Sequence, residues 1–280
     1  QTYTGNPGCF QENAAFMDAV TPSKMKATFA KWIDDTPYVL TILPTDKYEV
    51  AQTDLDRSAG VPYPTEKVEF QFPKLQTATL SNGAKVVLAQ RKGVPLVELN
   101  FQFDFGYAQE NNDELGYTNF MMGMLNEGTK KYSSLEFDEV LDSLGSNLGF
   151  GSGLDTSVAS LSSLKANLSE TLDLAKEALI NPTFPEKEIE RIKKETLAGI
   201  IQEENRPASI AYRNIGKLLY GEAHPYGKPL TGSGISKTIS AITRKNIVDV
   251  HSRAINSAHL TFAVAGDIEI EKTKDLIAQY

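Results

Sequence analysis

Three residues in the segment GYTNFMMGMLNEGTKKYS, from Gly116 to Ser133, stand at the spacing used by metal-binding helices. Asn119, Met122 and Gly123 occupy positions i, i+3 and i+4, which share one face of an α-helix. On such a face two imidazoles can hold a zinc ion while a carboxylate beside them activates a bound water. Here Asn119 offers only a neutral amide oxygen, Met122 has no proton to exchange and Gly123 has no side chain. The segment has the frame of a catalytic helix without its reactive groups.

No other residues offer a ready-made chemical site. The three histidines, His224, His251 and His259, are not in i, i+3 or i+4 relation, so a metal site would have to be assembled from them in space. We expect instead a loop histidine and two histidines on or after a helix. The single cysteine, Cys9, has no disulfide partner in the chain and is predicted to be an incidental thiol. The glycine-rich run at 145–153 lacks the GxxxxGK[ST] context of a phosphate loop and is predicted to be a turn between a helix and a strand.

The composition is typical of a globular protein and argues against two partner classes. The chain has 280 residues, 41% hydrophobic and 23% charged, enough for one large domain or one domain plus part of another. A net charge of −8 without any run of basic residues argues against nucleic acid. No apolar stretch reaches the length of a membrane span. The first residue is not Met and the last residues, EIEKTKDLIAQY, resemble a helix in progress, so we expect a fragment or processed piece, with a removed signal peptide left open.

An internal repeat organises the chain. Residues 21–44 align without gaps on residues 243–266, an offset of 222 that matches the size of a domain. Each copy begins with Thr as a candidate N-cap, continues with apolar residues at helical spacing and ends in a β-rich run. We therefore expect residues 1–48 to be the tail of one domain, 49–72 to be a polar linker with two prolines, and 73–280 to be a second copy.

The second copy is predicted to mix strands and helices without regular βαβ alternation. Its strand signals are a hairpin at Asn82-Gly83, a run with Phe101, Phe103 and Phe105 on one face, and the alternating LDTSVASLSSL. Helices are predicted at 114–126, 134–144, 168–180 and 186–204. In the first copy, Trp32 must be buried together with Phe29 and Ile33.

These segments, in this order, resemble a known family. LSNG followed by an apolar strand, the Phe-rich strand and GYTNFMMGMLNEGTKKYS are similar to the opening of a pitrilysin/insulinase-type (M16) zinc metallopeptidase domain. NPTFPEKEIERIKKETLAGI, HPYGKPLTG at 224–232 and LTFAVAGDIEIEKTKDLI are similar to its later segments. The resemblance covers roughly 73–280. It implies an α+β fold of the LuxS/MPP-like type, a metallopeptidase α/β sandwich in which helices pack on a mixed, mainly antiparallel sheet.

In that family the first helix carries His-x-x-Glu-His, and a Glu about 76 residues further on is the third zinc ligand. The resemblance places Asn119 and Gly123 at the histidine positions, Met122 at the base and Gly199 at the third ligand. Glu203 and Glu204 lie one turn beyond, with no histidine near position 119 to join them. We expect no metal, cofactor or catalytic residue in this segment, and zinc in the catalytic half of the enzyme.

Peptidases of this family consist of four similar domains in two halves that close into a chamber. By resemblance, this chain is a non-catalytic domain that forms part of the peptide chamber and supports proteolysis by a zinc-bearing half, either upstream in the same chain or in a separate subunit. The alternatives are a structural subunit and a peptide-binding module without peptidase activity.

The expected substrate is an unfolded peptide. The family binds peptides by adding a strand to a sheet edge, and the counterpart of that edge here would be Leu99–Phe105. Ordinary core packing of the three phenylalanines is the simpler reading of that strand. The resemblance also weakly favours a periplasmic or otherwise exported location.

Overall fold

The computed structural model of the chain describes residues 8–33, 39–41, 72–255 and 260–278. The chain divides into two compact units, Gln1–Val68 and Glu69–Tyr280. The first unit contains helices α1 (Cys9–Asp18) and α2 (Pro22–Trp32).

Helix α2 forms as its sequence predicts, but its apolar residues are exposed. The side chain of Thr21 accepts a hydrogen bond from the backbone N–H of Lys24 at 3.3 Å, which makes it the N-cap. Phe29, Trp32 and Ile33 are 64%, 72% and 58% exposed, so the described residues of the first unit do not bury them as predicted. Residues 39–41 of the predicted strand have no regular structure, and the rest of it lies outside the described residues. A lone strand without a neighbouring sheet is not stable.

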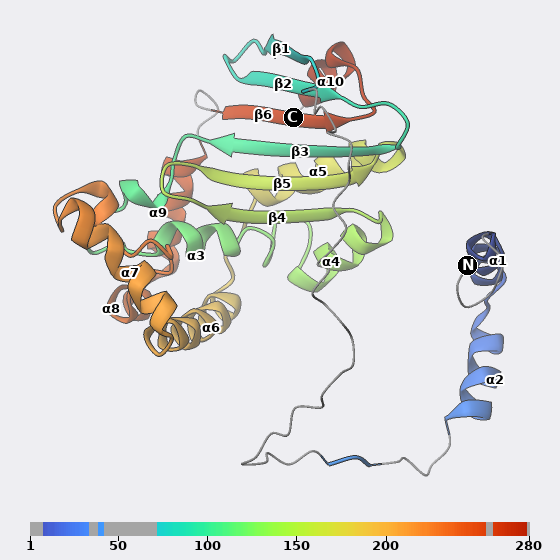
Figure 1. Cartoon of the computed structure of the whole chain (residues 1–280), viewed down its shortest axis with the longest axis horizontal. Helices are drawn as coiled ribbons and strands as arrows, with labels where there is room; N and C mark the ends of the chain where they lie inside the picture. The colour runs from blue at the N-terminus through green and yellow to red at the C-terminus, as the bar shows by residue number, and fades with distance from the viewer. Residues whose placement is uncertain (1–7, 34–38, 42–71, 256–259, 279–280) are drawn as a thin grey trace, which may run out of the picture. The chain divides into compact units, whose positions relative to one another are not determined.

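The second unit is built on one six-stranded sheet (Figure 1). Its strands are β1 (Leu75–Thr79), β2 (Lys85–Gln90), β3 (Leu96–Phe103), β4 (Asn147–Ser152), β5 (Ser157–Leu164) and β6 (Leu260–Gly266). The strand order is β1-β2-β6-β3-β5-β4, and only the β2–β6 pair is parallel.

The strands follow local signals. The β1–β2 connection is the predicted Asn-Gly turn, in which the Asn82 side chain accepts from the backbone N–H of Ala84 at 3.0 Å. Strand β3 alternates between exposed and buried residues, so one face of the sheet meets solvent and the other meets helices. On the buried face the rings of Phe101 and Phe262 lie edge to face, 5.3 Å apart.

Eight helices are described in this unit. They are α3 (Tyr117–Gly123), α4 (Ser134–Ser143), α5 (Leu168–Ile180), α6 (Glu186–Glu204), α7 (Pro207–Tyr220), α8 (Ser236–Ala241), α9 (Arg244–Ala254) and α10 (Ile270–Ile277). Short 3₁₀ helices occur at η1 (Tyr107–Gln109), η2 (Lys165–Asn167) and η3 (Pro225–Gly227). In Figure 1, α6 to α9 gather beside α3, beyond the β4 edge of the sheet. None of the described helices is long and apolar enough to cross a membrane.

The mixed, mainly antiparallel sheet with helices packed on it confirms the predicted fold class. Two local predictions need correction. The glycine-rich run at 145–153 is largely strand β4 rather than a turn, because it pairs with β5 along its length. The helix predicted at 114–126 is shorter, because Gly116 is left-handed and α3 ends at Gly123.

The core joins the sheet to the helices. Buried Ile247 and Val250 of α9 lie on the face of that helix that packs against α3, which contributes Phe120 and Met121.

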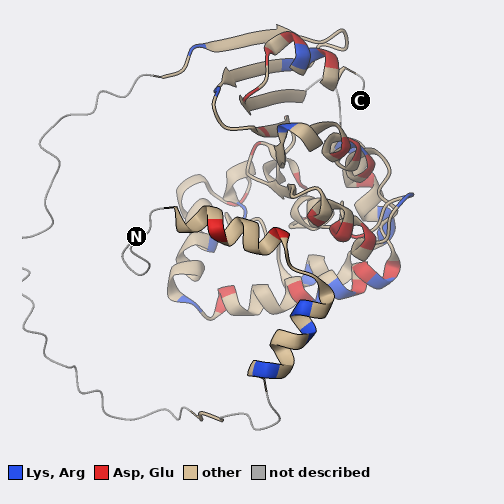
Figure 2. Cartoon of the chain, turned by 90° about the vertical axis from the view of Figure 1, so that its right-hand side faces the viewer, with Lys and Arg blue, Asp and Glu red and all other residues tan. Residues whose placement is uncertain are grey.

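Acidic and basic residues are interspersed along the helices in the view of Figure 2.

Candidate functional site

A buried carboxylate holds the N-terminus of α3, the helix in which the sequence predicts the frame of a metal-binding motif. Gly116 precedes the helix with φ of 91°, in the left-handed region that favours glycine. The side chain of Glu110 accepts hydrogen bonds from the backbone N–H groups of Gly116 at 2.8 Å and Thr118 at 2.7 Å. These N–H groups have no acceptor inside a helix, and a negative charge at a helix N-terminus is stabilising. Glu110 therefore fixes where α3 starts and which way it points.

The ionisable groups around this N-terminus are tied to the main chain. Burial raises the pKa of Glu110, against the opposing effect of its N–H donors and of Lys228. Burial lowers the pKa of Lys228, whose ammonium group donates to the carbonyl oxygens of Ala108, at 2.7 Å, and Glu110. Burial is also the main cause that raises the pKa of Tyr107 to about 12, and its hydroxyl donates to the carbonyl of Leu230 at 2.8 Å. These groups anchor the loop 228–234 to the segment before α3.

Asn119, at the first frame position, joins three segments. Its Nδ2 donates to the carbonyl of Gly232 at 3.1 Å, and its Oδ1 accepts from the backbone N–H of Ser152 at 3.0 Å. Gly232 has φ of 68°, and a Cβ there would collide with the Asn119 amide and the Tyr107 ring. Both polar atoms of Asn119 are thus used to connect α3 with the end of β4 and with the loop 228–234.

The other three frame positions have contrasting surroundings. Met122 is fully buried in the hydrophobic core. A Cβ placed on Gly123 or on Gly199 would meet no heavy atom within 4 Å outside its own helix, so both positions face open space. Among the described residues, no group of three or more His, Cys, Asp or Glu side chains is placed to hold a metal ion.

A buried arginine ties α6 and α7 to the loop 228–234. The guanidinium of Arg213, on α7, donates to Glu203 Oε2 at 2.5 Å, to the Ser233 hydroxyl at 2.8 Å and to the Gly234 carbonyl at 2.8 Å. The Ser233 hydroxyl also donates to Glu203 at 2.8 Å. Glu203, considered in the sequence as a neighbour of the third ligand position, is therefore the partner of a buried cation. Breaking such a pair leaves an uncompensated charge.

The two histidines among the described residues are structural in this arrangement. His224 Nδ1, in the loop before η3, accepts from the backbone N–H of Tyr226 at 3.0 Å. His251, on α9, lies 2.8 Å from the Leu179 carbonyl through Nε2, and burial lowers its pKa. His259 lies outside the described residues.

The free sheet edge beside α3 is β4. The interpretation of Leu99–Phe105 as an edge strand is wrong, because β3 is hydrogen-bonded to β5 on one side and to β6 on the other. Strand β6 comes from the far end of the sequence, and the local pattern of β3 did not show where it would insert. On β4, the N–H of Ser152 is directed outward to Asn119. Because alternate residues of an edge strand share this direction, Phe150 and Leu148 also turn their backbone groups outward.

Helix α7 carries an apolar face that points away from the domain. Its buried residues Arg213 and Gly216 lie on one side. The opposite side holds small and apolar residues at i, i+3, i+4, i+7, i+10 and i+11, namely Ala208, Ala211, Tyr212, Ile215, Leu218 and Leu219. Leu218 is 81% exposed. We call these six residues the α7 face. This helix was not predicted from the sequence, although Pro207 at its start and the spacing of its apolar residues indicate a helix.

Comparisons with known proteins agree with this geometry. Residues 85–232, more than half of the chain, match the model of the family described as Insulinase (Peptidase family M16). A crystal structure from Pseudomonas fluorescens, described as a peptidase M16 inactive domain, is 31% identical with a TM-score of 0.69 and covers 74% of this chain and 50% of its own.

Curated relatives include both peptidases and non-peptidases. An uncharacterized zinc protease of Rickettsia felis is 25% identical over 193 residues, which is 69% of this chain and 46% of the relative. The non-peptidase homolog YmxG of Helicobacter pylori is 23% identical over 210 residues, 72% of this chain and 48% of the relative. The chain spans about half the length of the curated relatives it matches.

Proposed function

Because the chain belongs to the insulinase family of peptidases (family M16), we propose that it is a non-catalytic part of a zinc metalloendopeptidase, which shapes the peptide chamber of a zinc-bearing partner half. Residues 73–280 would be the domain with the degenerate motif, and 1–48 the tail of a preceding domain of the same fold. The exposed apolar side of α2 fits a tail whose own domain is elsewhere.

The observation that carries the proposal is how the four motif positions are used. Asn119 is engaged in two structural hydrogen bonds, Met122 is part of the core, and Gly123 and Gly199 have no side chains. A zinc peptidase needs imidazole or carboxylate ligands and a base that takes a proton from water. None of these four positions supplies one, while the frame of α3 is intact. A scaffold without ligands fits a supporting role.

Peptide binding is assigned to β4. An extended peptide can pair with an edge strand through backbone hydrogen bonds, and β4 is the edge beside α3. Because Asn119 already accepts the hydrogen bond of the Ser152 N–H, a bound peptide would pair with the backbone groups of Phe150 and Leu148. Its hydrogen bonds to β4 would end before they reach α3. The strand would hold a substrate without offering it a reactive group.

The α7 face is assigned to the partner half. A contiguous set of exposed apolar residues on one helix marks an interaction surface. The spacing of Ala211, Ile215 and Leu218 suits the groove of another helix. Its six residues are few beside the roughly 20 to 30 residues per side of a stable interface. This favours a partner that makes further contacts over a second copy held by α7 alone.

The test compares the chain with its zinc-bearing partner present or absent. Alone, the chain should bind zinc at well below one ion per molecule and should not cleave an unfolded peptide. With the partner half, peptide cleavage should appear, and Leu218→Asp on the α7 face should reduce it, while the exposed control Asn214→Asp should not. Full cleavage by the partner without this chain would refute the proposal.

A second candidate is a structural subunit with no role in proteolysis. The similarity to a non-peptidase homolog favours it. It predicts that Leu218→Asp prevents assembly with a partner that lacks peptidase activity.

A further inference from the structure

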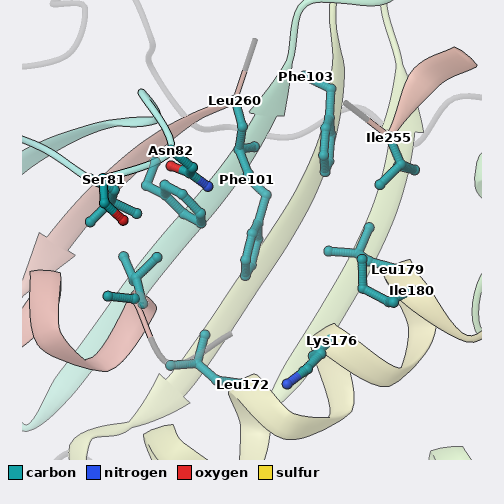
Figure 3. A pocket seen from close by; sticks show the side chains of 14 residues that line it. Ser81, Asn82, Phe101, Phe103, Leu172, Lys176, Leu179, Ile180, Ile255 and Leu260 are labelled. Atoms are coloured by element: carbon teal, nitrogen blue, oxygen red, sulfur yellow. The ribbon is translucent and has the colours of Figure 1, made fainter. Parts of the chain in front are cut away.

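An apolar cavity of about 350 Å³ lies between α5 and α10, with Phe101 and Leu172 in its lining (Figure 3). Of the described residues that line it, only Lys176 is ionisable, and Lys176 already has an interaction of its own. The cavity therefore does not select a ligand by charge. A corner of the sheet does, because a carboxylate lies there beside aromatic rings.

This corner is formed by the turn between β4 and β5 and by η3. Residues 153–156 connect Ser152 of β4 to Ser157 of β5, and Asp155 in this turn is exposed. The hydroxyl of Tyr226, in η3, donates to the Asp155 carboxylate and lies 2.7 and 2.8 Å from its two oxygens. Tyr226 therefore holds an exposed carboxylate in one position.

The negative charge of Asp155 is not neutralised by its neighbours. A phenol is a neutral donor with one proton, whereas a carboxylate has about four acceptor positions, so most of these positions stay open. Among the residues that the structure describes, no cationic side chain forms an ion pair with Asp155: Lys217 pairs with Glu222, and Lys228 donates to main-chain carbonyls. The hydrogen bond to Asp155 raises the pKa of Tyr226, so the phenol keeps the proton that it donates.

Three aromatic rings adjoin this carboxylate. The rings of Tyr220 and His224 are stacked with their centroids 5.0 Å apart, and they lie edge to face with the Tyr226 ring at 5.7 and 5.4 Å. His224 accepts from the backbone N–H of Tyr226 through Nδ1, so its ring carries no positive charge in this arrangement. Tyr220 and His224 are exposed. A carboxylate beside exposed aromatic rings suits a guanidinium group, which combines ion pairing with stacking.

We propose that this corner binds the guanidinium group of an arginine in the extended peptide assigned to β4, an inference that rests on that assignment. The turn 153–156 directly follows the edge strand, so one end of a peptide paired with β4 lies at this turn whichever way the peptide runs. Ser152 and Asp155 are three residues apart, which is at most about 11 Å between their Cα atoms. The long side chain of an arginine beside Ser152 closes such a gap, and its planar fork matches the carboxylate oxygens.

The test is the binding of a fluorescently labelled, extended peptide to the 280-residue chain, measured by anisotropy. Three versions of the peptide carry arginine, lysine or the uncharged citrulline near both ends, because either end can face the turn. The arginine peptide should bind about fivefold more tightly than the citrulline peptide, in the upper range for one exposed ion pair. The lysine peptide should lie between them, because an ammonium group has the charge without the planar fork.

Two matched variants locate the effect. Asp155→Asn keeps an acceptor for the Tyr226 hydroxyl but removes the charge, so it should abolish the preference for arginine over citrulline. Asp249→Asn, an exposed position on α9, should leave the preference unchanged. Circular dichroism checks that both variants are folded.

The inference is overturned if the arginine and citrulline peptides bind equally, or if the preference survives Asp155→Asn. Equal binding of the lysine and arginine peptides overturns the choice of a guanidinium group, since the site then recognises charge alone. If none of the three peptides binds, the inference fails together with the assignment of β4. Loss of the preference while all three peptides still bind leaves the proposed function standing, and a chain that binds the arginine peptide through Asp155 but supports no cleavage keeps this site and refutes that function.

Discussion

Replacing Asn119 by alanine tests whether its side chain stabilises the domain by connecting α3 with β4 and the loop 228–234. The change removes the acceptor of the Ser152 N–H and the donor to the Gly232 carbonyl, and it adds nothing in their place. The α3 helix itself should tolerate alanine, which is the best helix former. Any loss of stability therefore reports the two hydrogen bonds.

The size of the effect follows from those bonds. Each typical hydrogen bond contributes about 0.5–1.5 kcal/mol, so removing both should cost about 1–3 kcal/mol. Asn119 is half-buried, so water can reach part of the vacated space, and a value of about 2 kcal/mol is expected. For a domain of this size, about 2 kcal/mol corresponds to a fall in melting temperature of roughly 4–8 °C.

Urea denaturation followed by far-UV circular dichroism is the appropriate assay. The only tryptophan of the sequence, Trp32, lies in the first unit, so tryptophan fluorescence would not follow unfolding of the domain. Asn119→Ala should lower the urea midpoint without changing the slope of the free energy against urea. Asn119→Asp keeps the acceptor for Ser152 but sets a carboxylate against the Gly232 carbonyl, so it should destabilise the domain at neutral pH at least as much.

The control is Asn112→Ala, in an exposed turn before α3, which should change the free energy of unfolding by less than about 0.5 kcal/mol. If Asn119→Ala changes the free energy of unfolding as little as this control, the hydrogen bonds of Asn119 do not stabilise the domain. The structural interpretation of position 119 is then refuted. A changed slope of the free energy against urea would instead show that the variant alters the compactness of the folded or the unfolded state.

Three further predictions concern the same region. Glu110→Gln places an NH₂ group near one of the backbone donors and should cost about 1–3 kcal/mol by urea denaturation. Because the pKa of Glu110 is raised in the native state, the native state binds this proton more readily than the unfolded state does. The contribution of Glu110 to the free energy of unfolding therefore falls as pH rises above 4.5. This pH-dependent contribution should be absent when the stability of Glu110→Gln is measured over a pH series. His251 has a lowered pKa, so its contribution is lost as pH falls below 6.5, and His251→Gln should lose less stability on acidification. Met122→Glu buries a carboxylate and should cost several kcal/mol, whereas Gly123→His, facing open space, should cost less than about 1 kcal/mol; equal stability of the two would contradict their placement.

Elements with strong local signals were predicted from the sequence. Helix α6 has the predicted bounds, Glu186–Glu204, because Pro185 precedes it and charged residues at helical spacing continue through it. The hairpin at Asn82-Gly83 was also predicted, since Gly83 supplies the left-handed conformation, with φ of 88°, that its turn uses. Such features need no knowledge of the rest of the chain.

Long-range features were not available from the sequence. The insertion of β6 between β2 and β3 places β3 inside the sheet, and it joins segments more than 150 residues apart. The Arg213 network links α6, α7 and the loop 228–234 through hydrogen bonds that no spacing rule predicts. Strand β4 contains two glycines, Gly149 and Gly151, which are poor strand formers, and its pairing with β5 makes it a strand.

At the four positions that the resemblance aligns with the zinc motif, each residue follows the space around it. Two of the positions face packed atoms. There Met122 fills space in the hydrophobic core, and Asn119 forms hydrogen bonds to β4 and to the loop 228–234. Where the position faces open space, at Gly123 and Gly199, no side chain is present and none is needed for packing. The core side of α3 is therefore constrained by packing. A helix with an inactive motif can be recognised in this way, because the size of each side chain follows the space available and not the requirements of metal coordination.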